Sequence, residues 1–221
     1  SRYTPMRDNR FSVVDFDGSD DKISFTRQVF TGAFTISWWF NGDTETHHQS
    51  IFNDSTGANN NILIKDSNGF VTIRINGTYK AIITAVPHNE WCHIVFTRDG
   101  SGNIKSYLNG VAKGTSSTTD EFALDMIGDG CVMSMSSASM YNVEKSAEEV
   151  YAIYQQGITY DESSLSGLQA YYRMGDDTSK AYPTIADSSS NSNDGTASGA
   201  VEAQQMVAGY DMGAFESTGE E

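Results

Sequence analysis

The chain has 221 residues, with 29 acidic and 14 basic side chains and a formal net charge of -15 at pH 7. A surface this negative repels phosphate backbones and anionic lipid headgroups, so neither nucleic acid nor a membrane is an expected partner. The length and the hydrophobic fraction of 38% fit one large domain with its own core. No apolar run is long enough to span a bilayer, and we expect no leader peptide in this chain unless one has been removed.

Short apolar runs with a period of two dominate the chain, separated by Gly, Asn, Asp and Ser. This alternation is typical of half-buried β-strands. In residues 34–40, for example, Trp38 shares one face with three phenylalanine or isoleucine side chains, and Trp39 lies on the other face. Asn76-Gly77 and Asn109-Gly110 predict hairpin turns. The expected strands cover residues 11–16, 22–25, 34–40, 50–53, 62–65, 70–75, 79–85, 91–98, 104–108, 111–113, 169–174 and 196–201.

One segment has helical periodicity. Ser146 and Glu149 have the spacing of a capping box, in which each side chain bonds the backbone N–H of the other residue. Apolar residues then recur every three or four positions, and Gly157 suits a left-handed C-terminal position. We expect a helix over residues 147–156, lying across the edge of a sheet.

Many short strands and one short helix predict an all-β fold: a two-sheet antiparallel β-sandwich, or jelly roll, with the helix after the main strands. We expect one domain over residues 1–209 and an acidic extended tail over residues 210–221. Residues 167–201 either complete the sandwich or begin a truncated second domain, and the first is favoured because a lone strand pair cannot bury its apolar face. Cys92 and Cys131 are expected to be free buried thiols rather than a disulfide.

Three segments together resemble the laminin-G-like, concanavalin A-like lectin jelly roll. They are residues 14–23 with 34–40, residues 91–97 with 102–110, and residues 140–143 with 146–157. Residues 167–174 and 187–196 look like the opening strand segment of the same family, here placed after the helix. The resemblance implies two antiparallel sheets packed face to face.

The Tyr-Arg-Met-Gly-Asp sequence that begins at Tyr172 also resembles lectin-like structural proteins of tailed phages. This implies a non-enzymatic, virion-associated protein at the particle surface, in capsid decoration or a fibre. Its partners would be other virion proteins, host-surface glycans or both, and it would form a homo-oligomer or join a symmetric assembly. The alternative is a secreted bacterial carbohydrate-binding module or adhesin domain.

A glycan-binding surface needs an exposed aromatic ring, which stacks on the apolar face of a sugar, beside amide and carboxylate groups that bond its hydroxyls. Trp39 either has this role or packs in the core, and the core is favoured; Tyr79 and Trp91 have the same ambiguity. The Asn and Asp residues of the loop after residue 52 either bind hydroxyls or are ordinary loop polarity. The candidate glycan-binding residues are Trp39, Asn53, Asp54, Asn59, Asn60 and Tyr79.

Two groups of oxygen-bearing side chains are candidates for a structural calcium ion, which the resembled family often carries. One group alternates along a loop, and the other fills a turn, and both suit a hard cation that takes several oxygen ligands. The competing interpretations are a flexible polar loop and a tight turn. The candidate ligands are Asp187, Ser189, Asn191 and Asn193 in the loop, and Asp17, Asp20 and Asp21 in the turn.

Catalysis is not expected. Related glucanases place acidic residues on one strand in the order Glu-x-Asp-x-x-Glu, as nucleophile and general acid. This run is missing from the chain, in which Glu121 and Asp125 are four positions apart. Nucleophile-elbow, zinc-protease and phosphate-loop motifs are also missing. We therefore predict a protein of recognition or assembly rather than an enzyme.

Overall fold

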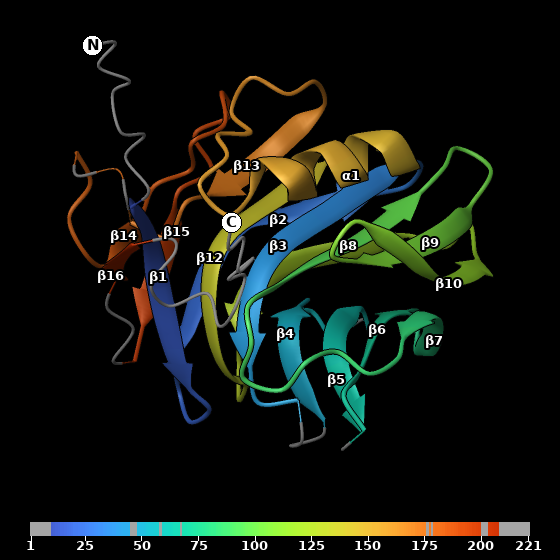
Figure 1. Ribbon diagram of the computed structural model, residues 1–221, viewed down its shortest axis with the longest axis horizontal. Helices are drawn as coiled ribbons and strands as arrows, with labels where there is room; N and C mark the ends of the chain where they lie inside the picture. The colour runs from blue at the N-terminus through green and yellow to red at the C-terminus, as the bar shows by residue number, and fades with distance from the viewer. Residues whose placement is uncertain are drawn as a thin grey trace, which may run out of the picture.

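The computed structural model describes residues 10–44, 48–57, 59–66, 68–175, 177, 179–199 and 203–207. The expected acidic tail, residues 210–221, lies outside this part of the chain. Two antiparallel sheets pack face to face with one short helix outside them, which confirms the predicted fold class (Figure 1). Among the described residues, no helix is long and apolar enough to cross a membrane.

One sheet, here called sheet A, lies under the helix. Its strands follow the spatial order β10 (Val111–Ser117), β9 (Asn103–Leu108), β8 (Cys92–Arg98), β3 (Phe34–Gly42), β12 (Val132–Tyr141), β1 (Arg10–Asp17) and β16 (Ala203–Val207), and β13 (Leu168–Tyr172) also pairs with β12.

The opposite sheet, sheet B, has the spatial order β14 (Thr184–Ile185), β15 (Gly195–Ser198), β2 (Lys22–Phe30), β11 (Phe122–Gly128), β4 (Gln49–Asn53), β5 (Asn61–Asp66), β6 (Phe70–Ile75) and β7 (Thr78–Ile83). Strands that follow the helix in sequence are present in both sheets, because β13 pairs with β12, β15 with β2 and β16 with β1.

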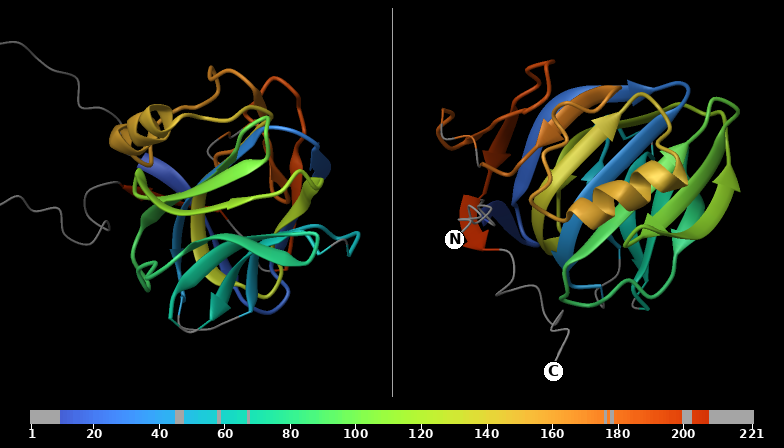
Figure 2. Two further views of the ribbon diagram at one scale, coloured as in Figure 1. Left: turned by 90° about the vertical axis from the view of Figure 1, so that its right-hand side faces the viewer. Right: turned by 45° about the horizontal axis from the view of Figure 1, so that its top comes forward.

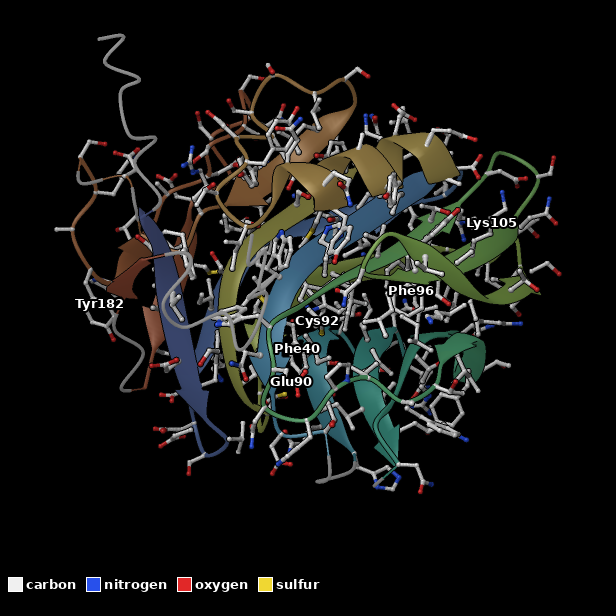
Figure 3. All side chains as sticks on the ribbon, viewed as in Figure 1. Phe40, Glu90, Cys92, Phe96, Lys105 and Tyr182 are labelled. Atoms are coloured by element: carbon white, nitrogen blue, oxygen red, sulfur yellow. The ribbon has the colours of Figure 1, made fainter. Side chains whose placement is uncertain are left out.

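The core fills the space between the sheets with the alternate side chains that the strand pattern points inward. Trp38 is completely buried and contacts Phe52 of the opposite sheet, with ring centroids 5.0 Å apart. Phe40, Cys92 and Phe96 lie in the same core cluster and are labelled in Figure 3. Cys92 and Cys131 are both buried and free, as predicted, and burial raises the pKa of each thiol. Neither thiol is therefore suited to ionise.

The helix α1 (Ala147–Gln156) has the predicted bounds and capping box: the Glu149 N–H donates to Ser146 Oγ at 3.2 Å, and the Ser146 N–H donates to Glu149 Oε2 at 2.8 Å. Gly157 has φ 81° and ψ 179°, so it is not in the predicted left-handed helical conformation, although glycine suits its positive φ. The predicted position at a sheet edge is also wrong. The helix lies on the outer face of sheet A, where Val150 packs on Val95 and Tyr107 (Figure 2, right).

Candidate functional site

A row of polar side chains crosses four neighbouring strands on the outer face of sheet B. Strand register places Asn53 of β4 opposite Asn61 of β5, Asn61 opposite Arg74 of β6, and Arg74 opposite Tyr79 of β7. Residues directly opposite each other in an antiparallel pair share a face. The neighbours Ile62 and Ile73 point into the core. This row, called the sheet B row below, therefore faces away from the core and is about 14 Å long at a strand spacing of about 4.8 Å.

The sheet B row combines an aromatic ring with unsatisfied polar atoms. Tyr79 is 39% exposed, whereas Asn53, Asn61 and Arg74 are half-buried. Asn61 Oδ1 and Arg74 Nε are inaccessible to solvent and have no hydrogen-bond partner among the described residues. Buried polar atoms usually have a hydrogen-bond partner, so two neighbouring atoms without one are unusual. The row thus offers one acceptor and one donor beside an open ring.

Two cations flank the ring of Tyr79. The guanidinium carbon of Arg74 lies 5.8 Å from the ring centroid, and Lys65 Nζ lies 5.7 Å from it. Such contacts hold a ring in place through the attraction between a cation and the π-electron face. The meander β5–β7 that carries this arrangement lies on the opposite side of the sandwich from α1 (Figure 2, left).

The loop between β4 and β5 is locked in place beside the row. Asp54 is 3% exposed and accepts hydrogen bonds from Arg27 Nε and Nη2 at 3.0 and 2.8 Å. It also accepts from the backbone N–H and the hydroxyl of Thr56. The Arg27 guanidinium is the main cause that lowers the pKa of Asp54 from 3.8 to about 2. Asp54 is therefore an anchor of the loop, and its predicted role in contacting a glycan is wrong.

The same loop docks on the β6–β7 turn. Asn60 is 4% exposed, and its Oδ1 accepts the Asn76 N–H at 3.1 Å. Asn60 is thus structural, which corrects its prediction as a ligand-binding residue. Asn59 is exposed, and its carbonyl accepts the Gly77 N–H at 3.1 Å, so Asn59 lies next to the turn that leads to Tyr79. Asn53 donates from Nδ2 to Asp129 at 3.1 Å and stays half-buried.

Trp39 is placed where it cannot stack on a sugar. It is 4% exposed, and its ring lies 6.0 Å from that of Tyr154 on the helix and 5.1 Å from that of His93. The alternation in β3 correctly puts Trp39 on the outer face of sheet A, but α1 covers that face. Trp91 is half-buried against Phe11. Of the predicted glycan-binding residues, the structure brings Asn53, Asn59 and Tyr79 to one accessible region.

The sequence interpretation missed Arg74, and it named Asn61 only as one of the loop residues that either bind hydroxyls or are ordinary loop polarity. A signal for Arg74 was present. The two-residue turn Asn76-Gly77 pairs Ile75 with Thr78 and therefore Arg74 with Tyr79. The position of Asn61 follows only from the pairing of β5 with β6 across a longer loop.

A polar depression lies at the end of sheet A, with a volume of about 260 Å³. Its polar lining comes from β1, β3, β12 and the segment before β8, and includes Asp15, Asn41, Asp43, Asn89 and Ser134. These residues are far apart in sequence and meet because β12 lies between β1 and β3. It is called the sheet A groove below.

The turn between β1 and β2 brings Asp17, Asp20 and Asp21 together. One carboxylate oxygen of each lies within 4.8 Å of the others. Asp17 and Asp20 are exposed, whereas Asp21 is 3% exposed and accepts the Asp17 N–H at 2.8 Å. Three carboxylates at this spacing form a donor set that fits a hard cation.

The loop of Asp187, Ser189, Asn191 and Asn193 is organised by hydrogen bonds instead. The Asp187 carboxylate accepts from the backbone N–H groups of Tyr171, Ser189 and Asn193 and from the Ser189 hydroxyl. The side-chain amides of Asn191 and Asn193 donate to the carbonyl of Gln169. These side chains turn toward backbone groups, so the predicted convergence of their oxygens on an ion is not seen.

Asp129 contacts Asn53 of the sheet B row directly, and two further carboxylates near the row hold the β4–β5 loop. Asp125 accepts from the backbone N–H and the hydroxyl of Ser55, and Glu121 lies 3.7 Å from Arg27. Both groups therefore help to hold the β4–β5 loop against β2 and β11.

The family model Laminin_G_3, described as the concanavalin A-like lectin/glucanases superfamily, matches residues 17–130, which is more than half of the chain. The chain therefore belongs to this superfamily, and the laminin-G-like resemblance is confirmed. No curated protein matches the chain significantly.

Solved structures share the fold at low sequence identity. A protein from Bacteroides ovatus, described as a candidate carbohydrate-binding protein, superposes with a TM-score of 0.71 at 19% identity, over 90% of this chain and 60% of its own. A heptameric pentraxin from Limulus polyphemus has a TM-score of 0.51 at 16% identity, over 66% and 83%.

The ligand-binding domain of botulinum neurotoxin serotype D, solved with N-acetylneuraminic acid, has a TM-score of 0.50 at 18% identity, over 72% of this chain and 44% of its own. The chain thus spans 60% of the Bacteroides protein and less than half of the neurotoxin domain. At these identities the likeness shows the fold alone.

Proposed function

We propose that the protein is a non-enzymatic carbohydrate-recognition module whose binding surface is the sheet B row. The observation that carries this proposal is the strand register, which aligns an exposed tyrosine, a guanidinium and two side-chain amides on one open sheet face. Flat rows of this kind suit an extended ligand that lies across the strands. Membership in a lectin/glucanase superfamily and the description of the Bacteroides relative support the same class of ligand.

The chemistry of the row matches that of a sugar. Tyr79 offers a ring on which the apolar C–H face of a pyranose can pack. Beside it, Arg74 Nε is an unpaired donor and Asn61 Oδ1 an unpaired acceptor among the described residues. Sugar hydroxyls both donate and accept hydrogen bonds, so one ligand can satisfy the two atoms once their side chains turn toward it. The locked β4–β5 loop keeps Asn59 at the end of the row, which lowers the entropy lost on binding.

Binding without hydrolysis is the activity that the nearby carboxylates favour. A glycosidase needs two carboxyl groups facing one glycosidic bond. Around the sheet B row, Asp54 is bound by Arg27, Asp125 by Ser55, and Asp129 by the side-chain amide of Asn53. The first two carboxylates hold the loop, and Asp129 alone would not supply the pair that hydrolysis needs.

We also propose that the protein acts at a virion surface, with a secreted bacterial module or adhesin as the alternative. The support is the phage-like sequence that begins at Tyr172. Assembly of several copies would raise avidity for a repeated glycan without any new contact. Mass spectrometry of purified phage particles tests this location: its peptides are expected in the particle, and their confinement to a bacterial culture supernatant would contradict it.

Asp17, Asp20 and Asp21 are the residues that we propose would hold a structural calcium ion. Carboxylate oxygens within 4.8 Å of one another repel each other unless a cation or protons offset the charge. A bound cation would stabilise the β1–β2 turn, which a hydrogen bond from the Asp129 N–H to the Asp21 carbonyl joins to the end of β11.

A glycan array tests the proposed function, using wild type, Y79A and N89A. Asn89 lies in the sheet A groove and serves as the matched control. We expect wild type and N89A to bind the same glycans and Y79A to lose most of that signal. A silent array for wild type, or a loss in N89A with full binding by Y79A, would contradict the assignment.

A further inference from the structure

We propose that the sheet B row selects acidic saccharides and that Arg74 is the residue that binds their carboxylate or sulfate group. This inference rests on the proposed function and names its ligand class.

Arg74 differs from the other arginines whose side chains the structure describes. Arg27 is bound by the Asp54 carboxylate, and Arg173 lies 3.3 Å from Asp161. Arg98 donates to the backbone carbonyls of three residues. Arg74 has neither a carboxylate nor a carbonyl partner among the described residues, and its Nε is buried without a hydrogen bond. A guanidinium offers several N–H donors in a fixed planar fork, so this one retains its binding capacity.

The charge around Arg74 is opposite to that of the whole protein. Residues 59–87 contain Lys65, Arg74 and Lys80 but only one acidic residue, Asp66, which gives a formal charge of +2 in a chain of -15. Lys65 lies beside the Tyr79 ring as Arg74 does, whereas Lys80 is opposite the core residue Ile73 and donates to the Ser117 carbonyl of β10 at 3.2 Å. The chain has 29 acidic residues, yet none of those that the structure describes pairs with Arg74. A local cationic region on an acidic protein attracts anions while the remaining surface repels them.

The geometry joins this charge to the ring of Tyr79. Arg74 and Tyr79 are directly opposite in the ladder, with the guanidinium carbon 5.8 Å from the ring centroid. A pyranose packed on the exposed part of the Tyr79 ring would lie next to the guanidinium, within reach of an acidic exocyclic group turned toward it. A carboxylate or sulfate at that position accepts two parallel N–H bonds from the fork, a charge-assisted contact stronger than a neutral one. A neutral hydroxymethyl group makes one weaker bond there.

The probes that separate charge from sugar recognition are trigalacturonate and its methyl ester, which share one carbohydrate chain. Calorimetric titration of wild type should give an affinity for the acid at least about tenfold higher than for the ester, because charged hydrogen bonds contribute more. R74Q should remove this preference, so that it binds the acid and the ester with affinities within about twofold of each other. R74K keeps the charge but not the fork, and should fall between them.

K105Q is the matched control, because Lys105 is exposed on the outer face of sheet A, where it pairs with Glu144, and removing it changes the net charge equally (Figure 3). It should bind both probes as wild type does. Thermal melting of each variant checks folding. Sulfated galactose oligosaccharides, run in parallel, separate sulfate recognition from carboxylate recognition, and binding of either one supports the inference.

Equal affinity for acid and ester together with no preference for the sulfated over the unsulfated galactose oligosaccharide, or a preference retained in R74Q, would overturn the acidic-ligand inference while the proposed function stands. Binding of inorganic sulfate as tight as that of the sulfated sugar would overturn it too, because the site would then bind a bare anion. If wild type binds no saccharide in the array or in solution, the proposed function fails together with this inference.

Discussion

Arg27 and Asp54 form a two-pronged ion pair that fixes the loop beside the sheet B row. Nε and Nη2 of Arg27 donate to the two carboxylate oxygens of Asp54 at 3.0 and 2.8 Å. The pair joins β2 to the end of β4, two strands that are separated by β11 in sheet B. Because Asp54 is buried, the contact is protected from the solvent screening that weakens surface pairs.

We predict that D54N destabilises the protein by about 2 kcal/mol at pH 7, which corresponds to the lowering of the Asp54 pKa from 3.8 to about 2. A carboxyl group whose pKa is lower in the folded state contributes its stability above the unfolded pKa. This contribution is therefore lost as the pH falls from about 4 to about 2. Urea unfolding at several pH values measures it. E148Q, a change on the exposed face of α1, is the control and should cost less than about 0.5 kcal/mol.

We predict that the burial of His93 makes a second contribution to the pH dependence of stability. Its ring is fully buried between Trp39 and Ser37, and burial lowers its pKa from 6.5 to about 3. The unfolded state gains a proton as the pH falls below about 6.5, whereas the folded state does not. Wild type should therefore lose about 2 kcal/mol between pH 7 and pH 5 relative to H93Q. Comparing the two proteins removes the opposite contribution of Glu162, whose pKa burial raises. Parallel pH profiles would contradict the prediction.

We predict that replacing Arg98 by lysine, which keeps the charge, strongly lowers the stability of the protein. Its side chain is buried and donates to the carbonyls of Phe30, Gly32 and Asp120 at 2.6–2.9 Å, with the guanidinium 4.7 Å from the Phe34 ring centroid. Lysine cannot reach three separate carbonyls with this geometry. We expect R98K to lower the free energy of unfolding by about 2–4 kcal/mol. A melting temperature equal to that of wild type would show that the three contacts are dispensable.

The turn of Asp17, Asp20 and Asp21 predicts a calcium-dependent melting temperature. A ligand that binds only the folded state at a concentration one hundred times its Kd stabilises it by about 2.7 kcal/mol. Calcium should therefore raise the melting temperature of wild type, and a chelator should reverse the shift. D20N removes an exposed carboxylate and should reduce the response. No change on chelation of wild type would rule out the proposed ion.

The strand pattern could be predicted from sequence wherever apolar and polar residues alternate. No expected strand covered β11, Phe122–Gly128, and none covered β12, Val132–Tyr141. Strand β12 is rich in Ser and Met, residues without a strong preference for strands, and a register shift between Met135 and Ala138 interrupts its alternation. Its neighbours define it, because it pairs with β1, β3 and β13.

The candidate site was only partly predictable for the same physical reason. Tyr79 and its partner Arg74 follow from a local hairpin turn. The burial of Trp39 does not, because the helix that covers it comes more than a hundred residues later in the chain. The role of Asp54 also depends on a distant residue, since Arg27 lies 27 positions earlier. Periodicity therefore predicts the face on which a side chain lies, while packing decides whether that face is accessible.

The most direct test of the sheet B row is a crystal structure of the protein with the strongest ligand from the glycan array. We predict that a sugar ring stacks on Tyr79, that its hydroxyls or acidic group bond Arg74 and Asn61, and that the β4–β5 loop keeps its position. A ligand seated in the sheet A groove, against Asp15 and Asn89, with the sheet B row empty, would contradict this account.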